Sequence, residues 1–307
     1  MKNKKCGEYD HDRTIVSVAL ATDKNYFAPT LVAIKSIVLT SSENHNYRIY
    51  ILSDSPVNNL EKNIYLSTIK NNENFEIFFI TVGDRVGSVK LSENGPTKGI
   101  TQATYFRFLL PDLLGNIDKI VYMDADTVVL DDIANIYIHD IQECYVGGVR
   151  DIAGYQNKDA RCQELNVENL DQYINAGVLL MNLDKLRNDN LSEKMLKLAA
   201  EKSFPYNDQD IINSICYGRI KCLPFDCNVI VDYLEKPKEI SEVLNIDYTK
   251  EAKEPIILHY AGRAKPWYSS KGHFTHCWWD VVDSFGWYIK LLIKYGARKL
   301  KKRSWKN

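Results

Sequence analysis

The sequence predicts an α/β protein with a mostly parallel, twisted sheet flanked by helices. Short apolar runs of strand length alternate with segments whose apolar residues recur at helical spacing, as in a doubly wound sheet. Aspartates follow several of these runs, and ligands of such sheets bind at the carboxyl ends of the strands. With 307 residues, 45% of them hydrophobic, the chain can form one large domain with an appendage.

The elements follow one another with few long loops. The first strand, TIVSVALATD, ends in polar residues, and apolar residues at helical spacing follow it from Ala28 to Val38. After the second strand, Ser55-Pro56 is expected to start a helix, with serine as N-cap and proline at the first helical position. Strands are expected at 14–23, 47–54, 75–82, 118–129, 145–151, 175–183, 220–229 and 255–262, helices at 28–38, 60–69, 104–114 (broken near Pro111), 191–202 and 208–218, and a loop at 83–99.

Charge and cysteine content exclude several classes of protein. A formal net charge of -1 provides no basic field for nucleic acid. The seven cysteines include no Cys-x-x-Cys pair, which favours a reducing, cytoplasmic compartment and disfavours a structural zinc site. The apolar run after the basic N-terminus is too short for a signal peptide or a membrane helix, so we interpret it as the first strand.

The C-terminal end has a composition of its own. Eight Lys or Arg and no acid occur between Gly286 and Asn307, among Trp287, Leu291 and Tyr295. On a helix these residues form an apolar side and a basic side, which suits peripheral contact with the inner face of an anionic plasma membrane. A helix docked on the core with a solvated basic end explains the pattern equally well. Residues 275–307 are therefore expected to form a basic, amphipathic helical segment after a catalytic domain at 1–274.

The stretch VYMDADTVV carries the first chemical signal. Asp124, Ala125 and Asp126 follow an apolar lead-in, and residues two apart on an extended strand project to the same side. Two neighbouring carboxylates repel each other, and a divalent cation such as Mg²⁺ or Mn²⁺ removes that cost. Substrate phosphates can complete the coordination. The alternative is a turn at a strand end, where aspartate is common without a metal.

Two classes of enzyme share this local pattern. In phosphatases of the haloacid-dehalogenase type, the first aspartate, here Asp124, is a nucleophile, but that motif normally opens its domain. In nucleotide-sugar transferases the pair holds a metal on the donor diphosphate, and the nucleotide-binding half precedes it. About 120 residues of α/β pattern precede the motif here, which favours the second class.

Further motifs make the second class specific. The stretches ATDKNYFAPTLVAIKSI, ATYFRFLLPDLL, YINAGVLLMNL, NDQDIIN and LHYAGRAKPW, in this order, closely resemble glycosyltransferase family 8. That family includes bacterial lipopolysaccharide galactosyl- and glucosyltransferases and, more distantly, glycogenin and plant galactinol synthases. The resemblance extends over roughly residues 15–267. It implies a GT-A type nucleotide-sugar transferase fold with a C-terminal helical extension, a UDP-glucose or UDP-galactose donor, Mn²⁺ (or Mg²⁺), and retention of the anomeric configuration.

The resemblance also implies a role for each matched position. Asp124, Asp126 and His259 would be the metal ligands. Gln209 and Asp208 would lie beside the anomeric carbon as the catalytic pair. The residues expected to contact the donor are Ala21, Thr22, Asp23 and Asn25 at the uridine, Arg107 reaching the donor, Asp124, Ala125 and Asp126 in the metal motif, Asn175, Asp208 and Gln209 at the sugar, His259 at the metal, and Gly262 and Lys265 at the diphosphate.

These roles combine into one expected reaction. A metal and Lys265 would stabilise the charge that develops on departing UDP. Because the neutral amide of Gln209 is a poor nucleophile, same-face attack by the acceptor is favoured over a covalent intermediate. The expected acceptor is a saccharide or a lipid-linked saccharide. A phosphatase using Asp124, and a nucleotide-sugar-binding protein that has lost transfer, are the alternatives.

Overall fold

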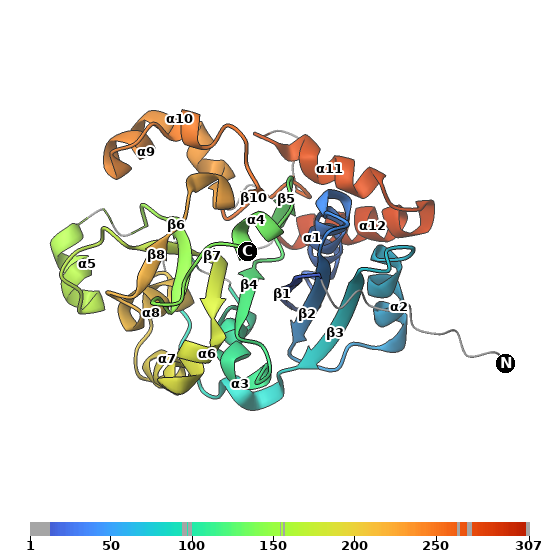
Figure 1. Cartoon of the computed structure of the whole chain (residues 1–307). Coiled ribbons are helices and arrows are strands. Elements are labelled where there is room, and N and C mark those ends of the chain that lie inside the picture. Colours follow the sequence, from blue (N-terminus) through green and yellow to red (C-terminus); the bar gives the residue numbers. More distant parts are fainter. Residues whose placement is uncertain are drawn as a thin grey trace.

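The computed structural model describes residues 13–93, 97, 100–153, 155, 157–262, 265–268 and 272–304, with side chains up to residue 296 at the C-terminal end. A seven-stranded sheet, ordered β3-β2-β1-β4-β7-β6-β8, forms its centre, and β5, β10 and β9 form a smaller sheet (Figure 1). The strands are β1 (Ile15–Thr22), β2 (Asn46–Ser53), β3 (Phe75–Thr81), β4 (Lys119–Met123), β5 (Thr127–Val129), β6 (Val146–Arg150), β7 (Ile174–Asn182), β8 (Ile220–Cys222), β9 (Val229–Ile230) and β10 (Ile257–His259).

The strand directions confirm the predicted mostly parallel sheet, with β7 as the exception that shapes the site. Parallel pairing joins β1 to β2 and β4, β2 to β3, and β6 to β8. In contrast, β7 runs antiparallel to both β4 and β6, with Val178 opposite Met123. The first residues of β7 therefore lie beside the carboxyl end of β4, where the Asp-x-Asp motif begins.

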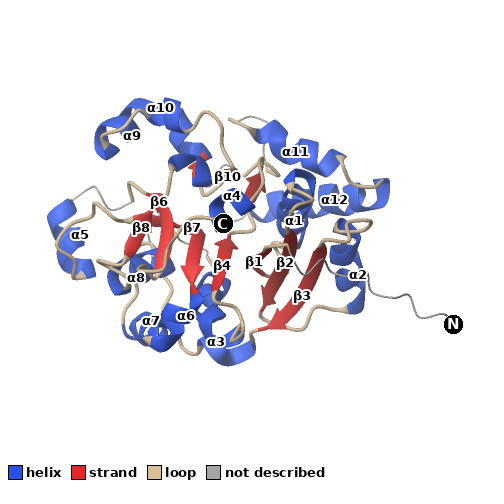
Figure 2. Cartoon of the chain, in the orientation of Figure 1, coloured by secondary structure: helices blue, strands red, loops and turns tan. Residues whose placement is uncertain are grey.

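Helices surround the strands (Figure 2). The α-helices are α1 (Phe27–Thr40), α2 (Asn59–Thr68), α3 (Leu110–Leu113), α4 (Ala134–Tyr137), α5 (Lys158–Leu165), α6 (Leu183–Asn188), α7 (Leu191–Glu201), α8 (Asn207–Ile215), α9 (Pro237–Leu244), α10 (Tyr248–Glu251), α11 (Thr275–Asp283) and α12 (Trp287–Ser304). Short 3₁₀ helices are η1 (Gly83–Val86), η2 (Gln102–Leu109), η3 (Phe225–Asn228) and η4 (Val231–Glu235).

Both faces of the large sheet are buried, as the apolar strand sequences require. In β1, Val16, Val18 and Leu20 belong to one hydrophobic cluster and Ala19 to a second, because successive side chains point to opposite faces. Strand β4 divides between the clusters in the same way. The carboxyl ends of β1 and β4 thus emerge from a packed core, which anchors the polar turns after them.

Several expected boundaries are wrong. Helix α2 begins at Asn59 rather than at Ser55-Pro56, because Asn58 and Glu61 form a reciprocal capping box: the Asn58 side chain accepts from Glu61 N at 3.0 Å, and Glu61 accepts from Asn58 N at 3.3 Å. Residues 102–109 are a 3₁₀ helix, and an α-helical turn with Pro111 in its first turn follows, so the expected helix at 104–114 is divided.

Two expected strands are each divided between elements. The strand expected at 118–129 becomes β4 and β5, which belong to different sheets, because the chain turns at 124–126. The strand expected at 220–229 becomes β8, the 3₁₀ helix η3 and the start of β9. A continuous apolar pattern does not reveal where a chain leaves one sheet for another.

The C-terminal segment forms two helices that contact α1. Trp278 of α11 and Ile293 of α12 are buried in the same hydrophobic cluster as β1. On the outer side of α12, Trp287 and Tyr295 are 75% and 69% exposed. Within the described residues, no helix combines the length and apolarity needed to span a bilayer. The most basic side chains, from residue 297 on, lie outside the described part.

Candidate active site at the carboxyl ends of β1 and β4

The Asp-x-Asp motif lies in a turn rather than on the predicted strand. Asp124 N donates to Gly177 O of β7 at 2.7 Å, and Thr127 Oγ1 donates to Asp124 O at 2.7 Å, which closes the turn. Strand alternation therefore does not explain why the two carboxylates lie together. Backbone contacts with β7 and with the start of β5 hold them instead.

The three predicted metal ligands lie close together in the structure: Asp124, Asp126 and His259. Strand β10 pairs antiparallel with β5, and Tyr260 N donates to Asp126 O at 3.0 Å, which places His259 beside the turn. His259 Nε2 lies 3.4 Å from Asp126 Oδ1 and 3.9 Å from Asp124 Oδ2. Candidate ligand atoms of the three residues all lie within 4.8 Å of one another. Two carboxylates and an imidazole are a ligand set that can hold a divalent cation.

Gly177 makes room for the His259 ring. A Cβ at Gly177 would lie within 2.8 Å of both ring nitrogens and closer still to Cε1, so only glycine allows β7 to pass the ring. His259 is 3% exposed, and its Nδ1 has no hydrogen-bond partner among the described residues. Packing against β7, rather than a hydrogen bond at Nδ1, holds the imidazole with Nε2 towards the carboxylates. The site therefore fits a divalent cation.

Lys265 supplies a cation at the same place. Its Nζ lies 2.5 Å from Asp126 Oδ2 and also donates to Tyr260 O. Burial would raise the pKa of Asp126, but the ammonium of Lys265 and the imidazole of His259 outweigh burial and lower it. Asp126 is therefore an anion in this site.

Arg107 is buried between two acidic residues and is 2% exposed. Its Nη2 donates to Asp124 Oδ1 at 2.8 Å, its Nε lies 3.2 Å from Asp208 Oδ2, and Nη1 donates to Ala176 O. The arginine thus directs Asp124 Oδ2 towards His259. Burial raises the pKa of Asp208 to about 6, although Arg107 and a hydrogen bond from Thr104 oppose the rise.

Asn175 and Gln209 meet where β7 begins and α8 starts. Asn175 Nδ2 donates to Gln209 Oε1 at 3.1 Å, and Gln209 Oε1 also accepts from Ala176 N at 3.1 Å. Both Nδ2 of Asn175 and Nε2 of Gln209 donate to Asp151 Oδ2, at 2.8 and 3.2 Å. Because a backbone N–H can only donate, these contacts determine which way the Gln209 amide faces.

Asp151 is a site residue that the sequence analysis missed. It is 3% exposed, follows β6, and accepts from the Tyr233 hydroxyl in addition to the two amides. Its only signal in the sequence was its position as the last residue of the strand predicted at 145–151. The partners come from three separate segments, so the sequence could not bring them together.

The residues expected at the uridine gather at the end of β1. Asp23 Oδ1 accepts from Asn25 N at 2.7 Å and from Tyr26 N at 3.0 Å, and Asp23 Oδ2 accepts from Thr101 Oγ1 at 3.2 Å. Tyr26, which the sequence analysis did not select, lies close enough to the carboxylates for Asp126 and Asp124 to raise its pKa beyond the effect of burial. Its ring packs edge-on against the Trp267 ring, with 6.0 Å between the two ring centroids.

The remaining predicted residues make backbone hydrogen bonds or packing contacts with other parts of the chain. Gly262 N donates to Asp232 Oδ2 at 2.9 Å, and a Cβ there would lie 2.5 Å from the Asp232 carboxyl carbon. Ala125, between the two aspartates, is 4% exposed. Thr22 Oγ1 accepts from Thr30 Oγ1 at 2.8 Å, beside Ala21 near the end of β1.

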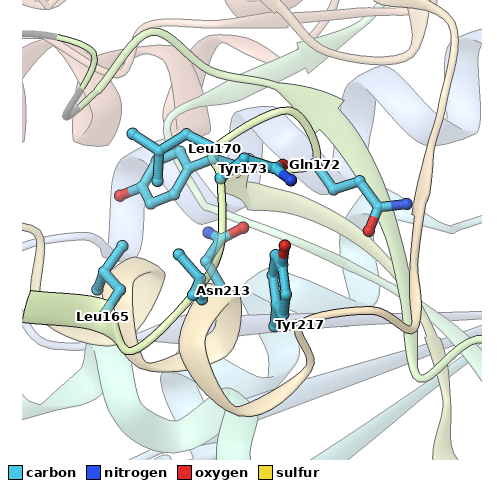
Figure 3. Close-up of a pocket in the computed structure, with 8 residues that line it drawn as sticks. Leu165, Leu170, Gln172, Tyr173, Asn213 and Tyr217 are labelled. Atoms are coloured by element: carbon cyan, nitrogen blue, oxygen red, sulfur yellow. The ribbon is translucent and has the colours of Figure 1, made fainter. Parts of the chain in front are cut away.

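Figure 3 shows a small pocket, two of whose lining residues, Tyr173 and Asn213, hydrogen-bond to Gln209. Leu165, Leu170, Tyr173, Asn213 and Tyr217 are among the residues that line it. None of the predicted site residues belongs to its lining. It therefore does not correspond to the candidate active site, although Tyr173 links the two regions.

Comparison with known proteins identifies the family. The family model for glycosyl transferase family 8 matches residues 17–271. General stress protein A of Bacillus subtilis is 26% identical over 84% of this chain and 90% of its own length. Lipopolysaccharide 1,2-glucosyltransferase of Escherichia coli K12 is 28% identical over 95% of this chain and 79% of its own length.

Solved structures confirm the GT-A fold. WbbM, a bifunctional glycosyltransferase, superimposes with a TM-score of 0.78 at 24% identity over 92% of this chain and 52% of its own. Galactosyltransferase LgtC, solved with donor and acceptor sugar analogues, superimposes with a TM-score of 0.72 at 22% identity over 88% and 96%. Family membership also removes the phosphatase alternative. The chain belongs to glycosyl transferase family 8 and is a glycosyltransferase.

Proposed function

We propose that this glycosyltransferase moves glucose or galactose from a UDP-hexose to a saccharide or glycolipid acceptor with retention of configuration, and that it requires Mn²⁺. The observation that carries the proposal is the convergence of Asp124 Oδ2, Asp126 Oδ1 and His259 Nε2 from a turn and a separate strand. Relatives named as lipopolysaccharide glucosyltransferases support the choice of substrate class.

The three ligands would hold the cation against the donor diphosphate, where it supplies positive charge to the departing UDP. Lys265 already lies beside Asp126 and adds a second cation at the same point. Arg107 holds one carboxylate oxygen of Asp124, so that the other stays directed towards the site. Charge stabilisation of the leaving group is the largest contribution expected from such a site.

The nucleoside would bind at the end of β1. The Asp23 carboxylate is positioned by two backbone N–H groups and by Thr101, and can accept a hydrogen bond from the uracil N–H. The neighbouring Tyr26 ring is partly buried and offers a flat surface for the base. With the nucleoside bound there, the diphosphate would lie between it and the Asp-x-Asp turn.

Retention is proposed to proceed by attack of the acceptor on the face that UDP leaves. Gln209 is neutral, and its Oε1 already accepts hydrogen bonds from Asn175 and Ala176 N, which makes it a poor nucleophile. We assign Gln209 and Asp208 to orienting the sugar and stabilising its positive charge in an oxocarbenium-like transition state. A glycosyl adduct trapped on any side chain of the wild-type enzyme would contradict this mechanism.

The test is UDP release from UDP-glucose and UDP-galactose without an acceptor, first with Mn²⁺ and then with EDTA. We expect slow transfer of one hexose to water, stopped by EDTA and restored by excess Mn²⁺. Release that persists in EDTA would refute the metal requirement. Absence of release with either donor, followed by absence of transfer to a panel of saccharide and glycolipid acceptors, would favour the alternative of a binding protein.

We also propose that α12 contacts an anionic membrane surface. Four large side chains on the outer side of α12 are exposed: Trp287 (75%), Tyr288 (50%), Leu291 (57%) and Tyr295 (69%). The opposite side of the helix, with Ile293, is buried. Aromatic residues beside a run of basic residues without acids match the headgroup region of an anionic leaflet. Such contact would bring the enzyme to a lipid-linked acceptor.

Replacing Trp287 and Leu291 by serine is expected to weaken binding to phosphatidylglycerol-containing vesicles by about tenfold or more, because two large apolar side chains leave the interface. Co-sedimentation measures the effect, with phosphatidylcholine vesicles as the uncharged comparison. Leu60→Ser provides the matched control, since Leu60 is 63% exposed on α2 and distant in sequence from the basic run. Equal vesicle binding by the double variant and the wild type would contradict the proposed contact.

A further inference from the structure

Behind Gln209, a chain of buried polar contacts leads away from the site to α5. The Tyr173 hydroxyl accepts from Gln209 Nε2 at 3.2 Å and donates to Asp210 Oδ1 at 2.6 Å. Asp210 is fully buried, and its Oδ1 also accepts from Arg161 Nη2. Arg161 is 8% exposed, and no motif in the sequence analysis includes it. The contacts connect a helix outside the site to the amide beside the reacting sugar.

The direction of each hydrogen bond depends on the charge at the end of this chain. An ionised carboxylate only accepts, so Asp210 takes the single proton of the Tyr173 hydroxyl. The hydroxyl then presents a lone pair to Gln209 Nε2. If Asp210 were protonated, its own O–H could donate to the Tyr173 hydroxyl, whose proton could then turn towards Gln209 Nε2, so that two donors would face each other. An anionic Asp210 therefore supports the orientation of Gln209 set by Ala176 N and Asp151, because it leaves the Tyr173 hydroxyl oxygen free to accept from Gln209 Nε2.

Arg161 maintains that anion. Burial raises the pKa of Asp210 above its ordinary value, and the guanidinium of Arg161 and hydrogen bonds from Tyr173 and Tyr206 N limit that rise. A buried carboxylate without such a partner would take up a proton. Arg161 also contacts Glu164, and Asp151 acts on Tyr173 from the side of β6. The charged and titratable groups around Asp210 include Arg161, Glu164, Tyr173, Tyr206, Asp151 and, from η2, Tyr105.

We propose that Arg161 is a positioning residue for Gln209, acting through Asp210 and Tyr173. The inference rests on the proposed role of Gln209 beside the donor sugar. Arg161 does not touch the predicted metal ligands, so its contribution concerns the rate of the chemical step rather than donor binding. Arg161→Met, with similar length and no charge, removes the ion pair, and Arg161→Lys retains a cation.

Arg187 offers a matched control. It is likewise a partly buried arginine, and it donates to the carbonyl oxygens of Pro111, Leu114 and Ile117 at 2.9 to 3.1 Å, outside the chain of contacts to Gln209. Arg187→Met should therefore reproduce the general cost of losing a structural arginine. Thermal unfolding of all the variants measures that cost separately from activity.

The expected result for Arg161→Met is a fall in kcat for UDP release of about 10- to 100-fold, with KM for the donor within about twofold of wild type. The loss should shrink as pH rises, because a higher pKa of Asp210 in this variant leaves more of it protonated at low pH and ionised again at high pH. Arg161→Lys should recover most of the loss. Arg187→Met should retain the kcat and pH profile of the wild type.

The side-chain amide signals of Gln209 in a ¹H–¹⁵N spectrum, identified by their loss in Gln209→Glu, provide a readout that does not depend on turnover. They should shift in Arg161→Met and stay in place in Arg187→Met. Unchanged signals together with unchanged kcat in Arg161→Met would overturn the positioning role. If the wild type neither releases UDP nor transfers a hexose to any acceptor of the panel, the proposed function is wrong, and the Gln209 signals still decide whether Arg161 positions that amide.

Discussion

Asp126→Asn is expected to lower the rate of Mn²⁺-dependent UDP release by about 100- to 1,000-fold and to abolish measurable Mn²⁺ binding. An amide is a far weaker ligand for a hard cation than a carboxylate. The substitution also leaves Lys265 Nζ, now 2.5 Å from Asp126 Oδ2, without its anionic partner in a buried position. Both the ligand set and the local charge balance would therefore be lost.

Initial rates with the preferred donor measure this effect, and Mn²⁺ titration followed by electron paramagnetic resonance measures binding directly. Asp131→Asn is the matched control, because Asp131 lies in the loop after β5, is exposed and faces no predicted ligand. It should keep the rate and the Mn²⁺ affinity of the wild type. Wild-type Mn²⁺ affinity in Asp126→Asn would show that this carboxylate is not a ligand.

Gly177→Ala is expected to disable the metal site without changing any ligand. A methyl group at this position would lie within 2.8 Å of both nitrogens of the His259 ring, so the ring must move away. Displacing the imidazole separates Nε2 from the two carboxylates. We expect Mn²⁺ affinity to fall by about tenfold or more, and overpacking of the core to cost about 1–3 kcal/mol of stability.

Mn²⁺ titration measures the loss of metal affinity, and thermal unfolding measures the loss of stability. Gly147→Ala is the control for adding a methyl group to the central sheet, because its Cβ would meet only the flexible side chains of Leu223 and Ile141 at 3.3 to 3.4 Å. That variant should lose some stability and keep its Mn²⁺ affinity. A Gly177→Ala protein that binds Mn²⁺ as tightly as wild type would show that His259 does not depend on this close approach.

Much of the chemistry could be predicted from local sequence. The apolar runs indicated the strands of the larger sheet because burial on both faces requires continuous apolar segments. The Asp-Ala-Asp motif indicated a metal site and the family resemblance implied His259 as a third ligand; the structure brings candidate ligand atoms of all three together. The geometric reason taken from strand alternation was nevertheless wrong, since the aspartates lie in a turn closed by Thr127 and Gly177.

The partners that orient these groups could not be predicted in the same way. Asp151, Tyr233 and Arg161 belong to no local motif, and each acts on a residue distant in the sequence. Tyr26 lay inside a matched stretch, yet its nearness to the carboxylates depends on how α1 follows β1. Long-range hydrogen bonds between side chains leave no periodic signal in a sequence.

By itself, the sequence determined the α/β class, where most strands lie along the chain and the residue types of the proposed metal ligands, because apolar spacing and residue type are local properties. Only the tertiary structure decided that β7 runs antiparallel to β4, which brings Asn175 and Gly177 to the Asp-x-Asp turn. The tertiary structure also decided which polar groups form hydrogen bonds with one another behind Gln209. Strand direction and buried hydrogen bonding depend on the packing of the whole chain, since each buried polar group must find its partner wherever the fold places one.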